Sequence, residues 1–141
     1  MRFEQFIESG DVRRQHPDFS RAESLRAETA KRRFFLKEVI EKLGLKETNT
    51  NYLIEIAYDL LMEAVRARML EEGFETRSHE AEVAFLRRLD FSEVELRLAD
   101  ELRRHRNKIL YYGKTFEKDY ARKALGFVES AYTRIQQNTQ P

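Results

Sequence analysis

The sequence predicts an all-α fold, an up-and-down bundle of four to five helices. Turn-forming residues are scarce, with five Gly and two Pro in 141 residues, and no proline lies between Pro17 and Pro141. A β-sandwich or barrel needs turn signals about every ten residues, and this chain lacks them. Charged residues make up 36% and apolar residues 41%, a balance that favours amphipathic helices around one core.

The chain length predicts a single domain covering residues 1–141. Residues 1–17 are polar with scattered apolar side chains such as Phe3 and Phe6, so we expect a short helix or a loosely docked arm there. Residues 136–141 are expected to form a frayed tail.

Local signals place the first long helix. Asp18 or Ser20 can cap its start, and Ser20 with Glu23 fits a capping box. The helix is expected to reach about Leu43, because Gly44 is a typical residue just beyond a helix end.

A second helix is expected from the polar run 48–51 to about Glu72, with Gly73 ending it. Its apolar residues cover far more than one stripe, which indicates a central helix or one that shares its faces between the core and a dimer. Ser78 then offers a cap for a shorter helix.

The last two helices complete the bundle. Ser92 with Glu95 forms a capping box that opens a helix running to about Tyr112, and Gly113 is placed to end it. The final helix is expected over about residues 115–136, where apolar residues recur three and four positions apart.

The composition excludes several kinds of site. The chain contains no cysteine, which excludes disulfides and thiolate metal sites, and its His, Asp and Glu residues show no zinc or di-iron spacing. We therefore expect neither a metal nor another cofactor. No apolar run approaches the roughly 18 residues of a membrane span, and the N-terminus lacks the apolar core of a signal peptide. These features favour a soluble, cytoplasmic protein with no membrane partner.

Charge is distributed unevenly along the chain. Residues 47–101 hold six Arg and fourteen Asp or Glu, whereas residues 102–141 hold nine Lys or Arg and three Asp or Glu. Residues 21–46 hold eight Lys or Arg and four Glu. This pattern is compatible with ordinary solvated helix faces, or with a basic surface built from both ends of the chain that suits a polyanion.

The segment 103–113 contains the candidate functional residues. Arg106 follows Leu102 by four positions and precedes Ile109 by three, so it lies on the apolar stripe of its own helix. An arginine cannot lose its charge there, so it pairs with a carboxylate, extends into a cleft or binds an anionic ligand. Candidate structural partners are Asp59, Glu63 and Glu55, on the second helix.

Other polar residues of this helix complete the candidate site. Asn107 follows Arg106 directly, and Tyr111 and Tyr112 lie five and six positions on, where a loosening helix end could bring a hydroxyl back toward the same cleft. His105 is the histidine nearest in sequence, whereas we interpret His79 as a surface residue at a helix start. Further candidates for nucleic-acid contacts are Arg103, Arg104, His105, Lys108 and Lys114.

The pattern of residues 51–64, then 72–74, then Ser78-His79 and later Arg106-Asn107 resembles the HEPN superfamily (higher eukaryotes and prokaryotes nucleotide-binding) over roughly residues 20–136. The resemblance implies a small helical bundle that dimerises and places an arginine, a polar residue and a histidine of each chain in a shared cleft. Many such proteins are metal-independent ribonucleases of toxin–antitoxin or defence systems, often encoded beside a minimal nucleotidyltransferase.

Carried over residue by residue, Arg106 matches the motif arginine and Asn107 the polar residue after it. The motif histidine falls on Tyr111 or Tyr112, and tyrosine is a poor general base at neutral pH because its pKa is near 10. We therefore expect a homodimer that binds RNA or a nucleotide in a cleft, with or without cleavage. The alternatives are a non-catalytic interaction module, such as an antitoxin-like or scaffold partner of a nucleotidyltransferase, and an unrelated bundle in which Arg106 forms a structural ion pair.

Overall fold

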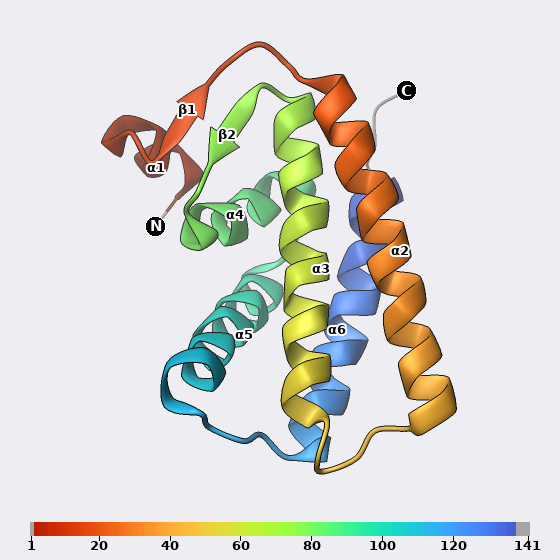
Figure 1. Ribbon diagram of the computed structural model, residues 1–141. Coiled ribbons are helices and arrows are strands. Elements are labelled where there is room, and N and C mark those ends of the chain that lie inside the picture. Colours follow the sequence, from red (N-terminus) through yellow and green to blue (C-terminus); the bar gives the residue numbers. More distant parts are fainter. Residues whose placement is uncertain (1, 138–141) are drawn as a thin grey trace.

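A computed structural model describes residues 2–137 and confirms the all-α fold (Figure 1). The elements are α1 (Phe3–Ser9), β1 (Val12–Arg14), α2 (Phe19–Leu43), α3 (Thr50–Glu71), β2 (Phe74–Thr76), α4 (His79–Phe85), a 3₁₀ turn (Leu86–Leu89), α5 (Glu93–Tyr112) and α6 (Lys118–Gln137). Of the tail expected over residues 136–141, Gln136 and Gln137 belong to α6 instead, and residues 138–141 lie outside the described residues. Within the described part of the chain, no helix is both long and apolar enough to cross a membrane.

Helix α3 is the centre of the bundle, as the apolar residues on several of its faces predict. Fourteen of its 22 residues are buried, because α2, α4, α5 and α6 all pack against it (Figure 1). One face stays partly open to solvent, and we call it the open stripe of α3. It consists of Tyr52, Glu55, Ile56, Asp59, Glu63 and Arg66, which recur at helical spacing.

Most helix ends follow the predicted signals. Ser92 and Glu95 form the expected capping box of α5, and Gly113 ends that helix in the left-handed conformation at φ +63°. At the start of α2, the structure selects one of the two predicted caps. Its cap is Asp18, whose carboxylate accepts a hydrogen bond of 3.0 Å from the Arg21 backbone N–H. Ser20 lies inside the first turn and forms no capping box.

Helix α6 starts at Lys118, three residues later than expected, because two residues of α3 hold the preceding loop extended. The Asn51 amide donates to the Lys114 carbonyl at 2.7 Å and accepts from the Phe116 backbone N–H at 3.1 Å. The Thr50 hydroxyl donates to the Phe116 carbonyl at 2.7 Å. These bonds satisfy the backbone outside a helix.

The sequence leaves two alternatives open for the N-terminal segment, a short helix or a loosely docked arm. The structure shows the short helix, and it packs firmly against the rest of the protein. Phe3 and Phe6 are buried, and the Phe3 ring lies 5.1 Å from the rings of both Phe74 and Phe85. Strand β1 then pairs antiparallel with β2 in a two-stranded sheet that the sequence pattern does not indicate. The three-residue strands are too short to show a period-2 pattern.

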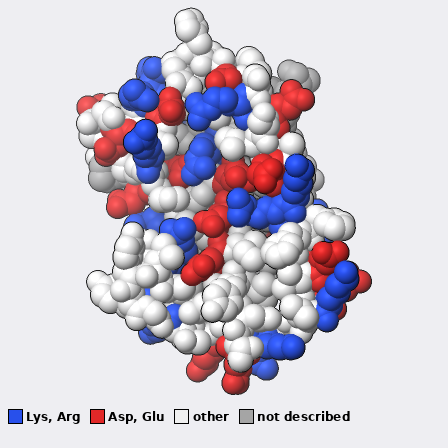
Figure 2. Space-filling model, viewed as in Figure 1, with Lys and Arg blue, Asp and Glu red and all other residues white. Residues whose placement is uncertain are grey.

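The basic ends of the chain are paired with its acidic middle. On α2, Arg26 bonds Glu71 of α3, and on α6, Arg134 bonds Glu95 of α5. Figure 2 shows the result on one face, where positive and negative side chains are interspersed. This arrangement fits ordinary solvated faces better than a broad basic surface.

Candidate functional site

Arg106 of α5 lies against the open stripe of α3. Its Nη2 atom is 3.3 Å from Oδ1 of Asp59, and its guanidinium lies over the Tyr58 ring, 5.3 Å from the centroid. The sequence proposes three carboxylate partners, and Asp59 is the one observed, since Glu63 is bound by Thr29 and Arg32 of α2. The side chain of Arg106 is 21% exposed and that of Asp59 39%. Pairing with a carboxylate is thus one outcome that the inward position predicts.

Two further arginines join Arg106. Arg103 lies three residues earlier on α5 and contacts Asp100 at 3.0 Å and Glu80 of α4 at 3.8 Å. Arg66, on the open stripe of α3, bonds Glu82 of α4 at 2.9 Å. We refer to Arg66, Arg103 and Arg106 as the arginine cluster, which lies where α3, α4 and α5 meet.

Helical spacing determines which candidates of α5 share the side of Arg106. Arg103 and Leu110 lie on that side, because positions three and four apart fall on one face, whereas Asn107 follows Arg106 directly and points about 100° away around the helix. Arg104 and Lys108 point to solvent on the opposite side, and Arg104 pairs with Asp100 at 3.4 Å.

The structure does not bring the predicted tyrosines to Arg106. Tyr111 and Tyr112 are 75% and 83% exposed on the last turn of α5, which stays helical up to Gly113. The loosened helix end that would return a hydroxyl to the arginine is therefore absent, and the assignment of both tyrosines to this site is not supported by the geometry.

His105 is also remote from the cluster. Its ring packs against Phe116 at 4.6 Å and Tyr120 at 4.7 Å, on the side of α5 that faces α6. Burial is the main reason that the pKa of His105 lies below its ordinary value, and Lys108 and Lys114 lower it further. Lys114 itself lies over the Phe116 ring. His105 is thus a packing residue.

The histidine beside the arginine cluster is His79, at the first position of α4. Its ring lies 5.5 Å from the Tyr58 ring, which Arg106 also contacts. Burial lowers the pKa of His79, and the charges of Arg106 and Arg66 lower it further. The imidazole is therefore neutral at pH 7. Sequence reasoning missed this residue because its position relative to Arg106 depends on the packing of α4 against α5.

A buried carboxylate completes the group. Glu82 is 1% exposed, accepts from Nε and Nη2 of Arg66 at 2.9 and 3.4 Å, and lies 3.3 Å from Nδ1 of His79. Burial raises the pKa of Glu82 to about 7, although Arg66 acts in the opposite direction. Burial likewise raises the pKa of Tyr58, so its phenol stays protonated.

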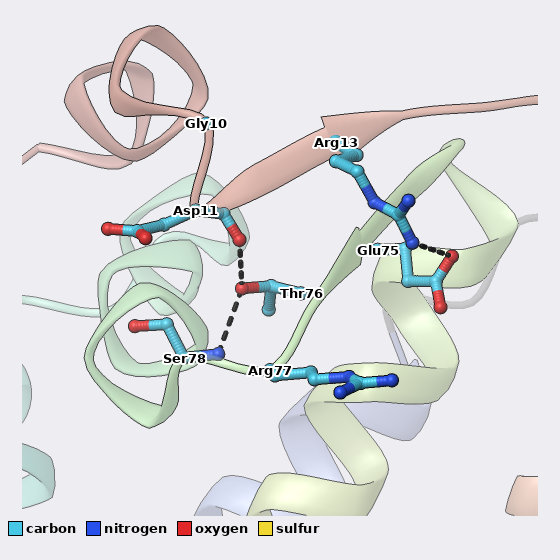
Figure 3. Close-up of a pocket in the computed structure, with 7 residues that line it drawn as sticks. All are labelled: Gly10, Asp11, Arg13, Glu75, Thr76, Arg77 and Ser78. Atoms are coloured by element: carbon cyan, nitrogen blue, oxygen red, sulfur yellow. Dashed lines mark hydrogen bonds and ion pairs between the residues drawn. The ribbon is translucent and has the colours of Figure 1, made fainter.

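Two hollows border this region without enclosing Arg106. One of about 560 Å³ lies between α4 and α5 and reaches Glu80 and Arg103. Another of about 500 Å³ lies beside the β1–β2 sheet. Figure 3 shows that polar groups of the second hollow join the two strands: the Thr76 hydroxyl donates to the Asp11 carbonyl at 2.6 Å, and Arg13 pairs with Glu75. The arginine cluster is thus an open charged surface that neither hollow encloses.

Among residues 2–137, no group of three or more His, Asp or Glu side chains could hold a metal ion. No family model matches the chain, and neither a curated protein nor a solved structure matches it. The fold and the site therefore define an all-α helical bundle with an arginine and histidine cluster on one face.

Proposed function

We propose that this chain is a HEPN-like bundle that binds RNA at the arginine cluster. The observation that carries the proposal is the convergence of three guanidinium groups and one neutral imidazole from α3, α4 and α5 on the Tyr58 ring and its surroundings. Guanidinium groups are the preferred side chains for phosphate, because their planar donors match its oxygens. The resemblance in sequence to the HEPN superfamily, with Arg106-Asn107 in the motif position, supports the same ligand class.

The form of the site favours a polymer over a free nucleotide. The side chains of Arg66, Arg103 and Arg106 are each partly exposed, and the hollow nearest to them in the fold leaves Arg106 outside its lining. A small nucleotide usually needs a concave pocket that covers most of its surface. A strand of RNA can instead lie along an open surface and contact several phosphates.

Arg106 has donor capacity for such a ligand. Within the described residues, one hydrogen bond from Nη2 to Asp59 engages its guanidinium. Its Nε has no partner but is closed off from solvent, so the terminal nitrogens are the donors that a ligand can reach. A guanidinium carries five N–H donors, and donors left without acceptors are costly when buried. A phosphate placed beside Asp59 would therefore add bonds without requiring Arg106 to move far.

A second copy of the chain would complete the proposed site. The open stripe of α3 leaves Asp59 and Arg66 partly exposed, on the same side of the helix as Tyr52 and Ile56. Two chains that face each other across this stripe would bring two arginine clusters to one cleft. A measurement of mass in solution tests this part, and a monomer at high concentration counts against it.

A non-catalytic interaction module is a second candidate function, and one observation favours it. Tyr111 and Tyr112 are exposed at one end of the bundle with Leu110 and Tyr52, and exposed aromatic groups of this kind are enriched in protein interfaces. A protein partner, such as the nucleotidyltransferase that the resemblance implies, would use that end. Loss of partner binding in Tyr112→Ala with RNA binding unchanged would assign the two functions to separate surfaces.

The test of RNA binding is fluorescence anisotropy with a labelled single-stranded RNA of about 20 nucleotides at several salt concentrations. We expect affinity to fall steeply with salt, because phosphate contacts release counterions. Arg106→Ala should weaken binding about tenfold, the effect of one charge-assisted hydrogen bond. Arg122→Ala removes the same charge from the exposed surface of α6 and should change affinity less than about twofold. Equal affinities for both variants, or no binding at low salt, would refute the proposal.

A further inference from the structure

The pairing of His79 with Glu82 is a feature that phosphate binding does not require. Both residues belong to α4, three positions apart, so their side chains lie on the same face of the helix. Nδ1 of His79 is 3.3 Å from Oε1 of Glu82. The carboxylate is almost fully buried, which fixes its position relative to the imidazole.

The two ring nitrogens of His79 have different surroundings. Nδ1 is closed off from solvent and has no well-aligned hydrogen bond, so Glu82 is the acceptor in reach. The side chain is 41% exposed, and Nε2 is not among the closed-off nitrogens that lack a partner. Since Glu82 contacts the Nδ1 side, Nε2 is the ring nitrogen left for a ligand.

We propose that Glu82 is a positioning residue for His79, which holds the proton on Nδ1 and leaves Nε2 as a hydrogen-bond acceptor beside the arginine cluster. In a neutral imidazole one nitrogen donates and the other accepts, and the partner of one nitrogen decides which. A carboxylate next to Nδ1 selects the Nδ1–H form. Histidines that bind metals are oriented by carboxylates in the same way.

The charges around His79 keep this acceptor neutral. Arg66 and Asp59 face the ring from α3, Arg103 and Arg106 face it from α5, and Glu82 faces it from its own helix. The arginines outnumber the carboxylates, and together with burial they lower the pKa of His79. Above about pH 7, where Glu82 is ionised, the neutral ring with Nδ1 protonated is an acceptor at Nε2.

This arrangement has one consequence for the choice of ligand, and that consequence rests on the proposed function. A lone acceptor beside a bound phosphate fits a ligand that carries a hydroxyl next to its phosphate. RNA has such a donor, the ribose 2′-hydroxyl, and DNA does not. His79 would therefore discriminate a ribonucleotide strand from a deoxyribonucleotide strand of the same sequence.

The positioning role is tested without any ligand by long-range ¹⁵N–¹H NMR of the histidine rings at pH 8, where Glu82 is ionised and His79 is neutral. The His79 signal is assigned from its loss in His79→Gln. We expect the Nδ1–H form to dominate in the wild type and in Glu80→Gln, which alters an exposed carboxylate of the same helix, and to decline in Glu82→Leu. A wild-type ring protonated on Nε2 overturns the proposal, and this result does not depend on whether Glu82→Leu folds.

The preference for RNA over DNA is tested by fluorescence anisotropy with an RNA and a DNA of the same sequence. The wild type should prefer RNA about tenfold, the effect of one hydrogen bond to an otherwise unpaired group, and His79→Gln should lose most of this preference. An equal preference for RNA in the wild type and in His79→Gln overturns the role of His79 in specificity. Absence of any RNA binding instead refutes the proposed function, and the NMR result still decides the positioning role.

Discussion

Arg106 and Asp59 join α5 to α3 through a contact of 3.3 Å between Nη2 and Oδ1, at a place where both side chains are partly exposed. An ion pair in such surroundings contributes little to stability, because water screens the charges and ordering two side chains costs entropy. The pair is therefore suited to exchange Asp59 for a phosphate. This weak coupling is the basis of the first prediction.

Asp59→Asn should increase the affinity for single-stranded RNA severalfold. The substitution removes the negative charge that competes with phosphate for Arg106, and it should lower the free energy of unfolding by less than about 1 kcal/mol. Anisotropy titration and urea denaturation measure the two effects. Asp119→Asn is the matched control, since it removes the same charge beside Arg122 on the exposed surface of α6. An equal gain in both variants would show that only the net charge matters.

Glu82→Gln should remove a pH dependence of stability. Glu82 has its pKa raised to about 7 in the folded protein, from an ordinary value of 4.5. The fold therefore favours the protonated carboxyl, and its ionisation lowers the free energy of unfolding progressively as pH rises from about 4.5 to 7. The full loss is about 3 kcal/mol and is constant above that range.

Urea denaturation of both proteins at pH 5, 6, 7 and 8 checks this prediction. The variant should gain stability relative to the wild type as pH rises, and the difference should level off above pH 7. Glu80→Gln, whose carboxylate is exposed, should differ from the wild type by less than about 0.5 kcal/mol at each pH. A constant difference for Glu82→Gln would mean that its carboxyl is ionised over the whole range.

Gly73→Ala should destabilise the protein by at least about 2 kcal/mol. Gly73 has φ +84°, and a Cβ atom there would lie 2.6 Å from the backbone oxygen of Gln15. Gly126→Ala should instead stabilise the protein by about 0.5–1 kcal/mol, because Gly126 is inside α6 with open space around it. Thermal or urea unfolding of both variants decides the matter. Similar effects of the two substitutions would contradict the close approach of Gly73 to the backbone oxygen of Gln15.

Tyr111→Ala and Tyr112→Ala should each change the free energy of unfolding by less than about 0.5 kcal/mol, because both side chains are largely exposed. The comparison is Tyr58→Ala, which removes a buried ring between Arg106 and His79. This substitution should lower the free energy of unfolding by about 3–5 kcal/mol. Urea denaturation compares the three variants. A large loss in either exposed tyrosine would show that it is covered in solution, as a protein interface would require.

Local signals in the sequence were sufficient for most helix boundaries. The capping box of Ser92 with Glu95 and the glycine at position 113 act within four residues of the helix end, so they can be read without knowledge of the fold. The apolar residues around α3 likewise predicted a central helix. The inward position of Arg106 followed from its spacing to Leu102 and Ile109, and the sequence narrowed its carboxylate partner to three residues.

The features that the sequence did not reveal depend on contacts between distant segments. The pairing of β1 with β2 involves two strands about 60 residues apart, and Asn51 delays the start of α6 through bonds to residues 114 and 116. His79 carries no periodic signal at the first position of α4, and only the packing of α4 and α5 around Tyr58 places it near Arg106. The sequence by itself determined the helices, their ends and the arginine that needs a partner. The tertiary structure decided which histidine and which carboxylate surround that arginine, because such contacts depend on how whole helices pack and not on spacing within one helix.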